Sequence, residues 1–171
     1  MSGPRDSQRG RVYAWENRII APCDSTFVDY ARAQSMVDAI WTEIGLKYPP
    51  AVELLPRQSS ATLASATRLS VFLPAKTPSW CLLHELAHAM TTDVDGSSDR
   101  HGPIFMGVYL KLISRYLRLD PDRLLESATV AGIAVTSDAN PIFVDAVCRP
   151  GNAHGQTSSG RIQTASEKQQ V

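Results

Sequence analysis

The stretch His84-Glu85-Leu86-Ala87-His88 lies within an apolar, helix-forming part of the chain that extends from residue 80 to residue 90. Residues four apart in a helix share one face, so both histidines of the stretch are expected to point the same way. Two imidazoles at this spacing can bind one metal ion, and the glutamate beside them can act as a general base. The pentapeptide therefore predicts a helix that carries a hydrolytic zinc site.

A third metal ligand is expected after this helix, because catalytic zinc takes three protein ligands and leaves one position for water. His101 is the best candidate, since it follows a polar loop and opens the next predicted helix, where the chain can turn back to the ion. Gly102 allows close approach of the backbone. The remaining histidine, His154, lies in a polar tail and is expected to be exposed. Three carboxylates of the loop are alternative ligands: Asp93, Asp95 and Asp99.

These residues predict hydrolysis by a metal-activated water. Zinc lowers the pKa of its bound water, and Glu85 would take the proton and pass it to the leaving amine. Asp93 or Asp99 would either orient a ligand imidazole or, more simply, cap the loop. A further donor would stabilise the oxyanion. Three residues are candidates for that donor, although the second of them also fits the core: Arg100, Tyr109 and Arg115.

The composition is that of one globular domain. The chain has 171 residues, of which 43% are hydrophobic and 20% are charged, and this size suits a single core. Its 17 basic and 17 acidic residues give a formal net charge of zero, so nucleic acid and anionic membranes are not expected partners. The N-terminal arginines, which Asp6 and Glu16 interrupt, are interpreted as a solvated surface. They are Arg5, Arg9, Arg11 and Arg18.

Neither a membrane span nor a signal peptide is predicted. No apolar run approaches the ~20 residues that cross a bilayer, and the first residues lack an apolar segment, so the expected location is the cytoplasm. The three cysteines are widely spaced and form no C-x-x-C pair, which argues against a disulfide scaffold or a cysteine-bound zinc. Of Cys23, Cys81 and Cys148, the second lies on the pentapeptide helix and is interpreted as a packing residue.

Apolar spacing predicts the elements before the pentapeptide. The strand closest to it, at 68–73, alternates polar and apolar residues, and its edge is expected to pair with an extended peptide substrate. The other elements are a loose terminus at 1–10, a short strand at 11–15, an amphipathic helix from Asp24 or Ser25 to about Gly45, a strand at 52–55, a connection at 58–66 and a turn at 74–78.

The pentapeptide helix is predicted to begin at Thr77, Pro78 or Ser79 and to end near Thr92. It is followed by a polar loop at 93–102, a helix at 103–118, a shorter helix from Asp120 or Pro121 to 130, and a helix or strand at 140–147. Together these elements predict an α+β fold of the zincin type, in which the helices pack on a small, mostly antiparallel sheet. One domain is expected over 1–148, with a disordered polar tail at 149–171.

The chain resembles the SprT-like group of zincin metallopeptidases in two motifs. The first is His84-Glu85-Leu86-Ala87-His88-Ala89, and the second, after Asp99-Arg100, is His101-Gly102-Pro103-Ile104-Phe105. The histidine of the second motif is the third zinc ligand in that group. The resemblance therefore implies His84, His88 and His101 as ligands and Glu85 as the catalytic residue. The whole chain, including residues 8–16, is also similar to a small group of actinobacterial and phage metallohydrolases.

The expected function is that of a metallopeptidase with one Zn²⁺ per chain and a peptide or protein substrate. One alternative is a non-catalytic module that holds a structural metal, against which the intact Glu85 argues. Another is a regulatory protease associated with DNA or a partner protein. The neutral composition argues against this alternative, and the chain has no paired cysteines of the zinc-ribbon kind that many SprT-like proteins add. The sequence does not predict the oligomeric state.

Overall fold

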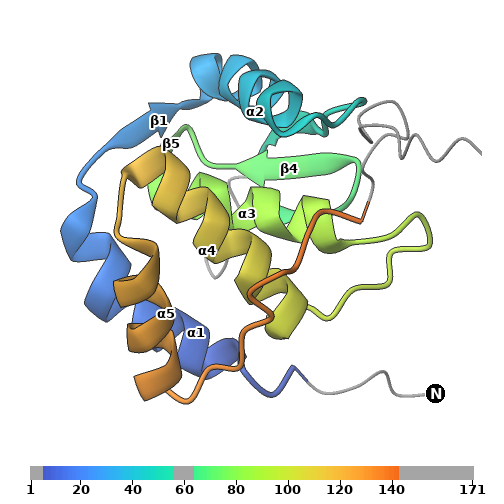
Figure 1. Ribbon diagram of the computed structural model, residues 1–171. Helices are drawn as coiled ribbons and strands as arrows, with labels where there is room; N and C mark the ends of the chain where they lie inside the picture. Colours follow the sequence, from blue (N-terminus) through green and yellow to red (C-terminus); the bar gives the residue numbers. More distant parts are fainter. Residues whose placement is uncertain (1–5, 56–63, 143–171) are drawn as a thin grey trace, which may run out of the picture.

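Two helices packed against each other form the centre of the computed structural model, which describes residues 6–55 and 64–142. These helices are α3 (Ser79–Thr91) and α4 (Pro103–Leu117). Strand β4 lies between α3 and a further helix, α2, so the described chain forms layers of helix, sheet and helices (Figure 1). The architecture is α+β, as predicted.

Helix α3 is buried on nearly every side. Ten of its thirteen residues are buried, including His84 and Glu85. A helix surrounded in this way is a core helix rather than a surface one. Polar side chains in such a place need partners, because burying an unpaired polar group is costly.

The strands form two small sheets instead of the single, mostly antiparallel sheet that was predicted. In the first sheet β1 (Phe27–Asp29) pairs antiparallel with β5 (Lys76–Pro78). In the second, β4 (Ser70–Leu73) runs parallel to β2 (Ala51–Leu54) and antiparallel to β3 (Ser65–Ala66). Val71 and Leu73 of β4 are fully buried, so the alternating pattern was a correct guide to the face that packs on the core.

Helix α2 (Tyr30–Ile44) begins later than predicted, because residues 27–29 form β1 and not a first helical turn. Its C-terminus is as expected. Gly45 has a φ of 87° and donates its backbone N–H to the carbonyls of Trp41 and Thr42, which is a left-handed glycine cap. The buried face consists of Ala33, Val37, Ile40 and Trp41.

The predicted strand at 11–15 is wrong, since these residues belong to helix α1 (Arg9–Trp15). A π-helical turn at Glu16–Ile20 and a 3-10 turn at Ala21–Cys23 continue it. Val12 and Trp15 are both fully buried, and their spacing of three places them on one helical face. The strand prediction rested on Val12 and Tyr13, which favour strands, but two residues are too short a pattern to distinguish a strand from a helix.

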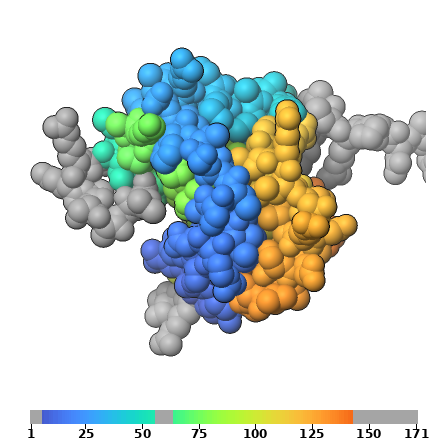
Figure 2. Space-filling view, turned by 90° about the vertical axis from the view of Figure 1, so that its left-hand side faces the viewer, coloured from blue at the N-terminus to red at the C-terminus, as the bar shows by residue number. Residues whose placement is uncertain are grey.

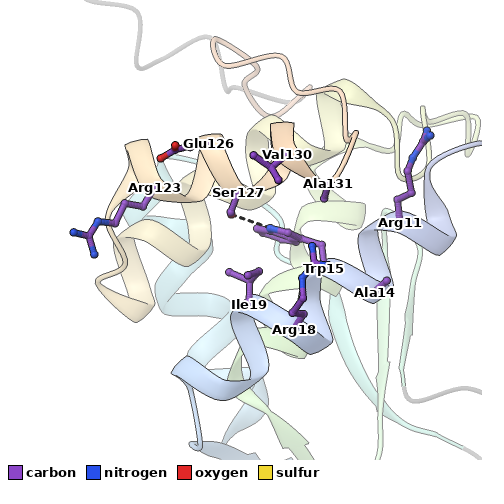
Figure 3. A pocket seen from close by; sticks show the side chains of 10 residues that line it. All are labelled: Arg11, Ala14, Trp15, Arg18, Ile19, Arg123, Glu126, Ser127, Val130 and Ala131. Atoms are coloured by element: carbon purple, nitrogen blue, oxygen red, sulfur yellow. Dashed lines mark hydrogen bonds between the residues drawn. The ribbon is translucent and has the colours of Figure 1, made fainter.

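Segment α1 packs beside α5 (Pro121–Val130), as the space-filling view shows for the blue and orange residues (Figure 2). The indole of Trp15 donates a hydrogen bond of 2.9 Å to the Ser127 hydroxyl (Figure 3).

Helices α4 and α5 confirm the predicted helices after the polar loop. Residues 140–142 form neither helix nor strand. The rest of the predicted element at 140–147, the tail at 149–171 and residues 1–5 lie outside the described residues.

Residues 6–8 are held in place, contrary to the expectation of a loose terminus. The Gln8 side chain is 6% exposed. Its amide nitrogen donates to the backbone oxygen of His101 at 3.0 Å, and its amide oxygen accepts from the backbone N–H of Ala134 at 2.6 Å. Among the described helices, none has the length and apolar content needed to span a membrane.

Candidate metal centre

The Nε2 atoms of three histidines form a small triangle. His84 and His88 are 3.1 Å apart, and each lies 3.3 Å from His101. Tetrahedral coordination with metal–nitrogen bonds of about 2.0–2.1 Å, as zinc makes in proteins, separates two ligand atoms by about 3.3 Å. The three imidazoles that the sequence predicted are therefore brought together and placed to bind one metal ion. Within residues 6–55 and 64–142, this is the cluster of ligand side chains that fits a metal ion.

His101 reaches the triangle because the preceding loop is fixed at both ends. Asp93 accepts the backbone N–H groups of Asp95 and Ser97 at 3.0 and 2.7 Å. Asp99 accepts the N–H groups at the start of α4, that of Ile104 at 2.6 Å. These carboxylates therefore cap the loop and the helix, and neither orients a ligand imidazole.

Gly102 permits the tight turn between this cap and the ligand. A Cβ atom at position 102 would lie 2.5 Å from the Asp99 carboxylate and 2.7 Å from the Asp99 backbone oxygen. Distances this short require the backbone to move. The expectation that glycine allows close approach here is confirmed.

Two carboxylates from the N-terminal segment bind the far side of the ligand rings. Glu16 lies 2.5 Å from Nδ1 of His84, and Asp6 lies 2.6 Å from Nδ1 of His101. A carboxylate only accepts, so Nδ1 donates in both pairs and the Nε2 lone pair is left for a metal. The described N-terminal arginines Arg9, Arg11 and Arg18 are exposed, as interpreted from the sequence, whereas the two acidic residues face the ligand rings. Both lie far from the histidines in sequence, so no local spacing could reveal them.

The electrostatics of the ligand rings favour uncharged imidazoles at two positions. Burial lowers the pKa of His88 well below its usual range, and the neighbouring His84 and His101 lower it further. Burial also lowers the pKa of His101, although Asp6 opposes the shift. For His84 burial acts in the same direction, but the hydrogen bond and charge of Glu16, with Glu85, raise its pKa overall. Neutral rings are the forms that bind metals.

Glu85 lies beside the ligands and is 6% exposed. Burial raises the pKa of Glu85 to about 7; the charge of His84 opposes this and that of Glu16 adds to it. A carboxylate with a pKa near neutrality is suited to exchange protons in a reaction, although a bound cation would favour its ionised form. Its position agrees with the role of a general base.

A cleft of about 440 Å³ opens onto this cluster. Its walls include Glu85, His88 and His101, the N-terminal residues Arg9 and Tyr13, and the range 64–67. That range contains β3, which forms an edge of its sheet among the described residues, whereas β4 lies between β2 and β3. The prediction that the strand at 68–73 faces a substrate is therefore wrong, and β3 is the strand beside the cleft.

The three predicted oxyanion donors lie in different places. Tyr109 is fully buried, its ring 5.4 Å from that of His84, and burial raises its pKa well above the usual range. Arg115 is paired with Glu43 on α2. Arg100 lines the cleft. Only Arg100 of the three has access to a substrate there.

Tyr13 is another cleft residue that the sequence prediction missed. Its ring lies 5.1 Å from that of His101 and 5.8 Å from that of His84, and it is 38% exposed. Burial raises the pKa of Tyr13, while Arg9 opposes the shift. The misassigned strand concealed this residue, because positions 9 and 13 are neighbours one turn apart in a helix but lie about 13 Å apart along a strand.

Cys81 is a packing residue, as predicted. It is buried, and burial raises the pKa of its thiol far above the usual range. A thiol of this kind is neither a ready ligand nor a nucleophile.

A second hollow, of about 510 Å³, lies between α1 and α5. Its lining contains none of the histidines, and Arg11 and Arg123 point away from Trp15 (Figure 3).

Comparison with protein-family models, with curated proteins and with solved structures gives no match for this chain. Its chemistry is therefore inferred from its own residues.

Proposed function

We propose that this chain is a zinc-dependent hydrolase of peptide bonds, built as a zincin-type domain. One observation carries the proposal. Three imidazole Nε2 atoms form a triangle with edges of 3.1 to 3.3 Å, and Glu85 borders the same open cleft. A purely structural metal site would need no carboxylate and no cleft at that place.

The ligand set fits zinc better than it fits other common metals. Imidazole nitrogen suits zinc, copper, iron and nickel, whereas magnesium and calcium prefer oxygen ligands. Three protein ligands with an open position are typical of catalytic zinc. His84, His88 and His101 would hold one ion per chain, with their rings oriented by Glu16 and Asp6.

The reaction follows from the groups around this position. Bound zinc supplies Lewis acidity and lowers the pKa of a water molecule towards neutrality. Glu85 accepts the proton of the attacking water and delivers it to the nitrogen that leaves. Glu85 is 6% exposed, so only a small part of it meets the cleft.

The strand β3 supports a peptide as substrate. Its unpaired edge in the described chain borders the cleft, next to Glu85 and His88. An extended peptide can add to such an edge through main-chain hydrogen bonds. This arrangement would lay the backbone of the substrate across the three histidines.

The test combines metal analysis with cleavage of a peptide library, read by mass spectrometry. Wild-type protein is expected to bind one zinc and to cleave a subset of peptides. Glu85→Gln should retain the zinc and lose cleavage by at least about 10³-fold, and His101→Ala should lose the zinc. Equal cleavage by wild type and Glu85→Gln would refute the catalytic role. Stoichiometric zinc without any cleavage would favour the alternative of a non-catalytic metal-binding module.

A further inference from the structure

Tyr13 reaches the metal cleft from a different element than Glu85 does. It belongs to α1, whereas Glu85 belongs to α3. The Tyr13 ring meets the ring of His101 edge-on, with an interplanar angle of 80°. With 38% of its surface exposed, Tyr13 contacts the ligand rings and remains open to a molecule in the cleft.

Arg9 fixes the orientation of this tyrosine from one helical turn away. Its guanidinium carbon lies 5.4 Å from the centre of the Tyr13 ring, so the cation packs against the phenol. A guanidinium only donates hydrogen bonds. Arg9 therefore cannot accept the O–H of Tyr13, which is left to donate to another acceptor.

The other candidate donors fit this position less well. Tyr109 is fully buried, and its hydroxyl is directed to the backbone oxygen of Trp80 at 3.5 Å. Arg115 is held by Glu43, far along α4. Arg100 lines the cleft, but its side chain is exposed and no described ring contact ties it to the ligands.

We propose that the Tyr13 hydroxyl donates a hydrogen bond to the carbonyl oxygen of the scissile bond as negative charge develops there, and that Arg9 holds the phenol in place. This inference rests on the proposed function. A preorganised donor of this kind contributes about 10²–10³-fold to kcat in hydrolases. Tyr13→Phe removes only the phenolic oxygen, so the hydrogen-bond donor is lost while the ring is kept.

The test uses zinc-loaded protein and acetohydroxamate, a small chelator whose carbonyl oxygen stands in for that of the substrate. Tyr13→Phe should keep the zinc affinity within about twofold and weaken hydroxamate binding, measured by calorimetry, by about 5- to 10-fold, which is the loss of one hydrogen bond. Tyr116→Phe is the matched control, since its hydroxyl bonds Glu43 on the surface, and it should behave as wild type.

In the peptide-library assay, Tyr13→Phe should lower kcat about 10²-fold with KM little changed. Unchanged hydroxamate affinity in Tyr13→Phe would overturn the proposal, and so would a loss of zinc, which would show a structural role only. Weaker hydroxamate binding without peptide cleavage by any variant would refute the peptidase function, yet it would support Tyr13 as a donor to a metal-bound carbonyl.

Discussion

The Nδ1 atom of His84 lies 2.5 Å from the carboxylate of Glu16, a residue 68 positions earlier in the chain. Both side chains are buried, at 5% and 3% exposure. A buried carboxylate against the far nitrogen of a ligand imidazole fixes the tautomer and strengthens the ligand. The hydrogen bond thus links the N-terminal segment directly to the candidate metal centre.

Glu16→Gln is expected to weaken zinc binding by about 10- to 100-fold. The amide keeps the shape and can still accept the Nδ1 hydrogen, but it loses the negative charge. Competition against a chromogenic chelator at pH 7 measures the change. Glu126→Gln, on the exposed side of α5, is the control and should leave the affinity unaltered. A Glu16→Gln protein with wild-type affinity would exclude the orienting role.

Asp6→Asn is expected to weaken zinc binding as well, through His101. The loss should be smaller than for Glu16, because Asp6 is more exposed, with 16% of its side chain accessible against 3%. Since the two carboxylates act on different ligands, the fold-losses in the double variant should multiply. The same chelator competition tests this. A double variant no weaker than Glu16→Gln alone would show that Asp6 contributes nothing.

Gly102→Ala is expected to lower zinc affinity by at least about tenfold and the free energy of unfolding by about 1–3 kcal/mol. The added Cβ would overlap the Asp99 side chain and backbone, so the backbone that carries His101 must move. Chelator competition and thermal unfolding report the two effects.

Gly10→Ala provides the control for this change. A Cβ atom at position 10 meets nothing within 4 Å, and alanine favours the helix by up to about 1 kcal/mol. The Gly10→Ala protein should be at least as stable as wild type, and its zinc affinity should be unchanged. If both alanine variants behaved alike, the close approach at Gly102 would not matter for the site.

Glu43→Gln is expected to reduce stability in a pH-dependent way. Hydrogen bonds from Tyr116 and Arg115 lower the pKa of Glu43 below its usual value of 4.5. A lowered folded-state pKa means that the contribution is present above pH 4.5 and is lost as the pH falls through the lowered value. The carboxylate is exposed, so the effect is small. Thermal unfolding of metal-free protein should show a Tm difference at pH 7 that shrinks towards pH 3; a constant difference would contradict the pairing.

The local part of the metal centre could be predicted from the sequence. His84 and His88 are one helical turn apart, so the helix alone brings them together. His101 could also be predicted as the third ligand, because a short polar loop and the start of the next helix limit the positions that the chain can reach after His88. The partners of these rings could not be predicted, because Glu16 and Asp6 approach through tertiary packing that leaves no periodic signal near either residue.

For the strands too, local features could be predicted from the sequence and long-range pairings could not. The alternation in 68–73 predicted a half-buried strand, and residues 70–73 form it, with Val71 and Leu73 inside. Its neighbours depend on pairings between distant segments, such as the parallel register of Ala51 with Ser70. Hydrophobic alternation describes the faces of a strand and says nothing about its edges, so the central position of β4 was not visible.

The contact of Gln8 with the backbone of His101, together with the two carboxylate–histidine pairs, has a consequence for how the protein matures. Residues 6–16 leave the ribosome well before their partners, because His84 follows Glu16 by 68 positions and His101 follows Asp6 by 95. Contacts so distant in sequence form late and depend on the whole domain. The triangle of imidazoles is therefore complete only after His101 has been synthesised and the domain has folded, and a chain truncated before His101 has only two of the three histidines.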